Sequence, residues 1–137
     1  MPFLFRVGHS RRSRTTYFRF QLKPNRPLDG FYFELSTEDL GSALSKKIGI
    51  VNEIEVGRPE FDSRYLIRTN DSLKAKTLLG YDAQREIDAG MRSMSLKFIK
   101  FSDGILYTSR KISTITQPEL QKYADFFTRI CERLEKV

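Results

Sequence analysis

The sequence predicts an α+β fold, in which an antiparallel sheet is packed by a C-terminal helix and by short connecting helices. Three patterns support this prediction. Residues 15–22 alternate between polar and apolar side chains, as a strand with one buried face does. Asp103-Gly104 separates two strand-like runs, which is a strong local signal for a hairpin. From Leu120 to Leu134, apolar residues recur at helical spacing. A hairpin-containing sheet covered by such a helix is an α+β arrangement.

The first half of the chain is expected to alternate between strands, one helix and turns. Ser36 or Thr37 is the candidate N-cap of that helix, and Gly49 is placed to end it. In chain order, we expect a strand at 15–22, a turn-rich connector at 23–30, a second strand at 31–35 antiparallel to the first, a helix at 38–48, a strand at 50–56, a turn or short irregular segment at 57–62, and a strand at 64–68.

The second half is expected to contain three helices and the hairpin. Asn70 or Asp71 caps a short helix that ends at Gly80, and a second short helix at 82–89 ends at Gly90. The hairpin strands are expected at 95–101 and 105–109.

Thr116 and Glu119 fit a capping box at the start of the last helix. Phe126 lies off the main apolar stripe, where it widens the buried face or marks a contact with another subunit. The stripe itself consists of Leu120, Tyr123, Phe127, Ile130, Cys131 and Leu134.

A single domain spanning residues 1–137 is expected, because this length suits one core and the connectors are short. Residues 1–14 are set apart as a mobile, basic N-terminal segment. The one cysteine, Cys131, excludes an intrachain disulfide. No apolar run approaches a membrane-spanning helix or the core of a signal peptide, so a cytoplasmic location is predicted.

The whole net charge of +7 comes from the N-terminal end of the chain. Seven of the 24 basic residues lie in the first 27 positions, where no acidic residue occurs, and the remainder carries 17 of each sign. Arg19 belongs to the predicted strand, so the candidate contact residues are Arg11, Arg12, Arg14, Lys23 and Arg26. Their charge can serve solubility or intramolecular contacts, bind phosphate in a nucleic acid or an anionic membrane surface, or meet an acidic protein partner.

Gly57-Arg-Pro-Glu-Phe-Asp62 is the most specific local pattern. It precedes the predicted strand at 64–68, the acidic helix start at Asp71 and a short leucine-containing helix. This run resembles the soluble domain of a class of uncharacterised bacterial proteins with a Gly-x-Pro-Glu-Phe-Asp signature. The resemblance extends more weakly over residues 50–110. In many of those relatives the domain is attached to membrane helices. The resemblance implies a fold more than a function.

The same segment supplies an alternative site. Glu60, Asp62, Arg64 and Arg68 could converge in a pocket of an enzyme or a small-ligand binder. The structural interpretation is that Phe61 anchors the loop while the carboxylates accept backbone hydrogen bonds or pair with the arginines. We expect this second arrangement, a locked loop before a strand.

No other pattern indicates catalysis. His9 is the only histidine, and Cys131 lies on the apolar stripe of the last helix, where it is expected to be buried. One cysteine and one histidine cannot form a zinc site, and no phosphate-binding glycine loop is present, so neither metal nor cofactor is expected. We therefore predict a binding or interaction module rather than an enzyme. Its partner would be an acidic protein, a second copy, a nucleic acid or an anionic membrane surface.

Overall fold

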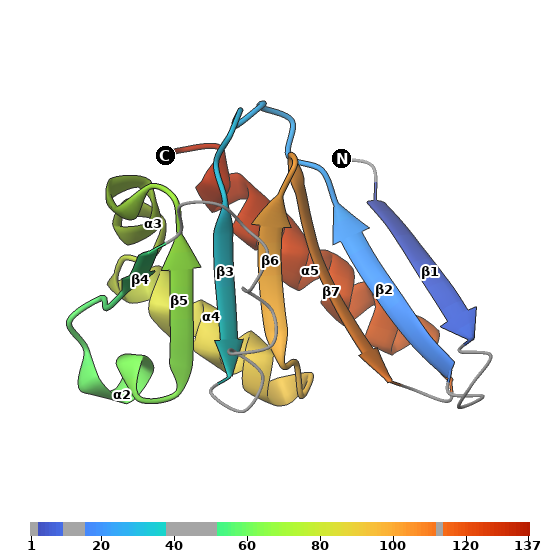
Figure 1. The fold of residues 1–137 in the computed structure, drawn as a ribbon. Coiled ribbons are helices and arrows are strands. Elements are labelled where there is room, and N and C mark those ends of the chain that lie inside the picture. The colour runs from blue at the N-terminus through green and yellow to red at the C-terminus, as the bar shows by residue number, and fades with distance from the viewer. Residues whose placement is uncertain (1–2, 10–15, 38–51, 112–113) are drawn as a thin grey trace.

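An antiparallel sheet forms the centre of the computed structural model, which describes residues 3–9, 16–37, 52–111 and 114–137 (Figure 1). Within these residues, seven strands lie in the order β1-β2-β7-β6-β3-β5-β4 and every neighbouring pair is antiparallel. The predicted α+β class, with its C-terminal helix, is confirmed. The elements are β1 (Phe3–His9), β2 (Thr16–Leu22), β3 (Phe33–Thr37), β4 (Asn52–Ile54), α2 (Pro59–Asp62), β5 (Tyr65–Thr69), α3 (Ser72–Leu78), α4 (Tyr81–Ser93), β6 (Phe98–Ser102), β7 (Ile105–Lys111) and α5 (Gln117–Leu134).

The two long helices, α4 and α5, lie on the same face of the sheet, and α5 crosses behind β2, β7 and β6 (Figure 1). Phe18 and Phe20 of β2 are fully buried on this side. The Phe18 ring is 4.9 Å from the Tyr123 ring, and the Phe20 ring is 5.0 Å from the Phe127 ring, between centroids. Both contacts are near-perpendicular, the edge-to-face geometry that aromatic quadrupoles favour. The apolar faces predicted for the first strand and the last helix are therefore confirmed.

The second predicted strand is antiparallel to the first, as expected, but the two strands are not neighbours. Strand β2 pairs with β1 and β7, whereas β3 pairs with β6 and β5. The β6–β7 hairpin lies between them, so that Phe20 is opposite Thr108 and Leu35 is opposite Ile99. Four of the five residues of β3 are buried, as a central strand requires. Local alternation indicates that a segment is a strand, but the partner depends on which distant segment completes the core.

Within the N-terminal segment set apart at residues 1–14, residues 3–9 form β1. The register places Phe5 opposite Phe20 and Arg6 opposite Arg19. The physical reason is that β2 would otherwise present a row of unpaired backbone N–H and C=O groups at the sheet edge. Residues 10–14 lie outside the described residues, as does the helix predicted at 38–48.

Helix α4 is longer than the 82–89 predicted, because Gly90 does not end it. A Cβ atom at Gly90 would lie only 2.2 Å from the nearest carbon of the Phe126 ring. This glycine therefore allows α5 to approach α4 closely, and it does not end the helix. Phe126 is only 6 % exposed and is part of the same core as the helical stripe, so its suggested contact with another subunit is also wrong.

The predicted hairpin and caps are present. Asp103 and Gly104 both have positive φ values, 53° and 77°, as a type I′ turn requires. Asp71 accepts a hydrogen bond from the Lys74 backbone N–H at 3.0 Å and caps α3. Thr116 caps α5 in the same way. The segment expected as a turn at 57–62 instead contains the single-turn helix α2.

Candidate functional site

The sheet has a strong charge asymmetry between its two halves. Among the described strand residues, the four neighbouring strands β1, β2, β7 and β6 carry five basic side chains and no carboxylate. The acidic strand residues, Glu34 and Glu53, belong to β3 and β4 in the other half. The five basic residues are Arg6, Arg19, Lys100, Arg110 and Lys111.

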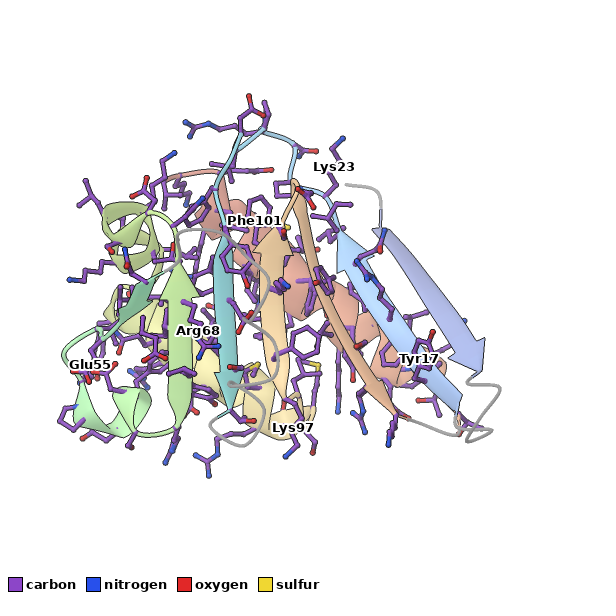
Figure 2. The ribbon with its side chains drawn as sticks, in the orientation of Figure 1. Tyr17, Lys23, Glu55, Arg68, Lys97 and Phe101 are labelled. Atoms are coloured by element: carbon purple, nitrogen blue, oxygen red, sulfur yellow. The ribbon has the colours of Figure 1, made fainter. Side chains whose placement is uncertain are left out.

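Three of these cations lie on the face of the sheet that points away from α4 and α5. In the register, Tyr17 pairs with Lys111, and both are exposed. The Arg19 guanidinium carbon lies 3.9 Å from the centre of the Tyr107 ring, and Lys100 pairs with Tyr107 across β6 and β7. We call Tyr17, Arg19, Lys100, Tyr107 and Lys111 the basic sheet face. Tyr17 is labelled near the start of β2 in Figure 2.

Arg110 points to the opposite side. Its guanidinium donates to the Met94 carbonyl at 2.6 Å and to the Tyr123 hydroxyl at 3.0 Å. It therefore stabilises the packing of β7 against the helical layer and is not available to a partner.

Of the contact residues predicted from the sequence, Lys23 and Arg26 belong to the described part of the structure. Arg26 donates to the backbone carbonyls of Glu135 at 2.9 Å and Val137 at 3.2 Å, so it ties the β2–β3 connector to the end of α5. A cation at this position is favourable, because carbonyl groups without helical partners collect there. Lys23 is exposed at the end of β2. Arg11, Arg12 and Arg14 lie outside the described residues.

Only two of the four residues of the alternative pocket, Glu60 and Arg64, line a common cleft. Asp62 accepts hydrogen bonds from the backbone N–H groups of Val56 at 2.9 Å and Gly57 at 3.0 Å, the loop lock expected from the sequence. Gly57 has a φ of 88°, a conformation that side chains with a Cβ rarely adopt. Asp62 is therefore occupied by its own loop.

Arg68 lies on the sheet, away from this loop, as Figure 2 shows. It pairs with Glu53 at 3.1 Å and lies 3.9 Å from the fully buried Glu34. The Tyr32 hydroxyl donates to Glu34 at 2.5 Å. Burial of Tyr32, together with this hydrogen bond, raises the pKa of its phenol. Arg68 thus neutralises carboxylates within the sheet.

Glu60 and Arg64 do line a common cleft, of about 210 Å³, between α2 and α4. Arg58 lies at the start of α2, and its guanidinium carbon is 3.8 Å from the centre of the exposed Tyr81 ring. The α4 wall consists of Tyr81, Gln84, Arg85 and Asp88. We call this the α2–α4 cleft.

The α4 residues of the cleft were missed by the sequence reasoning. Their spacing, at positions 81, 84, 85 and 88, places four polar or aromatic side chains on one helical face. That spacing was the available signal, but it does not distinguish a solvated face from a cleft wall.

Cys131 is fully buried, as predicted. Burial, together with Glu135 and Glu132, raises the pKa of its thiol to about 12. A thiol with such a pKa is a poor nucleophile at neutral pH. In the described part of the chain, no cluster of three metal-ligating side chains occurs, and no helix is long and apolar enough to cross a membrane.

No protein-family model and no curated protein sequence matches this chain. Among solved structures, the chain is similar to the mycobacterial trehalose monomycolate transport factor A, TtfA. The TM-score is 0.55 at 7 % sequence identity, and the match covers 95 % of this chain and 68 % of that one. This similarity concerns the fold.

Proposed function

We propose that the protein is a non-enzymatic binding module of the cytoplasm that docks single-stranded nucleic acid on the basic sheet face. The observation that carries this proposal is the absence of any carboxylate from the described residues of β1, β2, β7 and β6, which hold five basic residues. Phosphate groups would meet Arg19, Lys100 and Lys111 there without an acidic neighbour on these four strands. The carboxylate opposite Lys100 in the register, Glu34 of β3, is fully buried and accepts a hydrogen bond from Tyr32. The excess of positive charge in the whole chain, +7, acts in the same direction.

The aromatic residues favour a nucleic acid over other anionic partners. Tyr17 is 43 % exposed on the same strand face as Arg19. Bases stack on such rings with about 1–3 kcal/mol each, without sequence preference. The Arg19 guanidinium lies 3.9 Å from the centre of the Tyr107 ring and donates a hydrogen bond to the Gln21 side chain at 3.0 Å, so it offers a second stacking surface. A bilayer or an acidic protein would use the cations but not the stacking.

The transport role in the name of TtfA belongs to that protein. At 7 % identity, the similarity supports the architecture of this chain and leaves its partner to be argued from its own side chains. TtfA therefore neither supports nor opposes the nucleic-acid proposal.

The test is fluorescence anisotropy with a labelled single-stranded oligothymidylate, titrated at several salt concentrations. Three phosphate contacts predict that the logarithm of the affinity falls with the logarithm of the salt concentration with a slope of roughly −2. Tyr17→Ala should weaken binding by about tenfold, the effect of losing one stacked base. An unchanged affinity in Tyr17→Ala would contradict the proposed stacking of a base on Tyr17.

A matched pair of lysines tests the location. Lys111→Ala and Lys122→Ala remove the same charge from exposed positions on β7 and on α5, respectively. Only Lys111→Ala should weaken binding. Equal effects would show that the oligonucleotide responds to net charge and not to this face. Binding to anionic phospholipid vesicles or to polyglutamate, with none to the oligonucleotide, would overturn the proposal in favour of a membrane or an acidic protein.

A further inference from the structure

The α2–α4 cleft lies on the half of the sheet away from the basic sheet face and has features of a separate ligand site. Tyr81, which is 52 % exposed, lies close to two guanidiniums. The Arg58 guanidinium carbon is 3.8 Å from the centre of its ring, and that of Arg85 is 5.7 Å away. Among the described residues, no carboxylate lies within ion-pair distance of either arginine. Two cations without a carboxylate partner among the described residues therefore line the cleft.

The acidic wall of the cleft is already neutralised. Asp88 accepts hydrogen bonds from Arg64 at 2.7 Å and from the Tyr65 hydroxyl at 2.6 Å, and Arg92 lies 3.9 Å away. These interactions leave Glu60, exposed at the edge, as the carboxylate that opposes an incoming anion. The side chains of the cleft therefore carry a net positive charge.

The start of α4 adds backbone donors. Gly80 is its N-cap and has no side chain to cap the helix, so the first backbone N–H groups of this thirteen-residue helix lack a side-chain acceptor at that position. Such a helix start favours negative charge.

Gln84 supplies an independent sign of a missing partner. It is 6 % exposed, lines the cleft, and donates through Nε2 to the Leu79 carbonyl at 2.8 Å. Its Oε1 atom is buried and accepts no hydrogen bond from any described residue. A buried acceptor without a donor is costly, and a ligand N–H or O–H would satisfy it once the side chain turns toward the cleft.

We infer that the α2–α4 cleft binds a small organic carboxylic acid that carries an N–H or O–H donor beside its acid group. The planar carboxylate suits the two arginines, which bind such groups bidentately. The donor suits Gln84. A volume of about 210 Å³ lies below the ~300–1,000 Å³ of sites for drug-sized ligands and suits a small acid.

The experiment follows the ¹H–¹⁵N spectrum of the whole chain during titration with N-acetylglycine, which has both groups, and with acetate, which lacks the donor. N-acetylglycine should produce saturable shifts in the Gln84 side-chain amide and in the backbone amides of residues 81–83. It should bind at least about tenfold more tightly than acetate, since a hydrogen bond to a buried group is gained.

Three variants test the assignment. Arg85→Ala should weaken N-acetylglycine binding at least about tenfold, and Glu60→Gln should strengthen it because a repelling charge is removed. Lys76→Ala, an exposed change of equal charge on α3, should have no effect. The spectrum itself shows whether each variant is folded.

Absence of saturable shifts at residues 81–84, or equal loss in Arg85→Ala and Lys76→Ala, would overturn the inference. Inorganic phosphate binding there more tightly than N-acetylglycine would overturn the ligand class. Because Arg85 and Tyr17 lie on different elements, neither result depends on the oligonucleotide measurements.

Discussion

Replacing Gly90 by alanine tests the closest approach between α4 and α5. The added Cβ would lie 2.2, 2.4 and 2.9 Å from three carbons of the Phe126 ring. Because Phe126 is 6 % exposed and packs beside Phe127, with 5.7 Å between their ring centroids, the ring has little room to move. Overpacking of this kind costs about 1–3 kcal/mol.

The helix propensity of alanine offsets part of that cost. In an exposed helix interior, Gly→Ala stabilises by about 1 kcal/mol. Three contacts below 3 Å place the overpacking cost near the upper end of its range, so we expect Gly90→Ala to lower the free energy of unfolding by about 1–2 kcal/mol. Urea unfolding at 25 °C measures this difference, with an unchanged m value. Ala89→Gly, on the exposed side of α4, calibrates the propensity term at a neighbouring position.

Repeating the substitution in a Phe126→Leu protein separates the overpacking cost from the gain in helix propensity. Leucine at position 126 lacks the outer ring carbons, so in Phe126→Leu protein the Gly90→Ala change should lose most of its cost or become stabilising. The coupling energy of the double-mutant cycle should be about 1–3 kcal/mol. If Gly90→Ala stabilises the otherwise unchanged protein by about 1 kcal/mol, the proposed close packing of α5 on α4 is refuted.

Two further predictions concern the loop lock and the buried thiol. In urea unfolding, Asp62→Ala should destabilise the protein by about 2 kcal/mol, because two backbone N–H groups lose a charged acceptor. Asp62→Asn should destabilise it less, because the amide keeps one acceptor oxygen. Equal stability of the wild-type protein and both variants would contradict the loop lock. For Cys131, the thiol pKa rises on folding from 9.0 to about 12, so the folded state retains a proton that the unfolded state loses above pH 9. The resulting stabilisation is complete below pH 9 and falls, as the pH rises toward 12, by at most about 1.4 kcal/mol per pH unit. Between pH 9 and 10.5 the protein should therefore lose stability more steeply than Cys131→Ala, and parallel curves would contradict the burial argument.

Features of short sequence range were predicted well. The Asp103-Gly104 turn, the Asp71 and Thr116 caps and the buried face of β2 are each decided within a few residues of the chain. The Asp62 loop lock is of the same kind, because the acceptor and its two donors lie within six positions. Side chains that satisfy their own backbone leave a local pattern.

The candidate sites were only partly predictable. The basic excess of the N-terminal segment was visible, but Lys100 and Lys111 join Arg19 only because β6 and β7 insert beside β2. Arg26 was counted as a contact residue because its acceptors at Glu135 and Val137 lie at the far end of the chain. The α2–α4 cleft likewise depends on how two helices pack together, and the spacing of residues within either helix does not determine that packing.

By itself, the sequence determined the α+β class, the last helix and its buried face, and the concentration of positive charge at one end. Tertiary structure alone decided that β2 pairs with β7, that Gly90 lies inside a helix, and which cations share a face. The physical reason is range. Turns, caps and periodicity are set by neighbouring residues, whereas strand order and close helix contacts are set by the joint burial of apolar surface from distant parts of the chain.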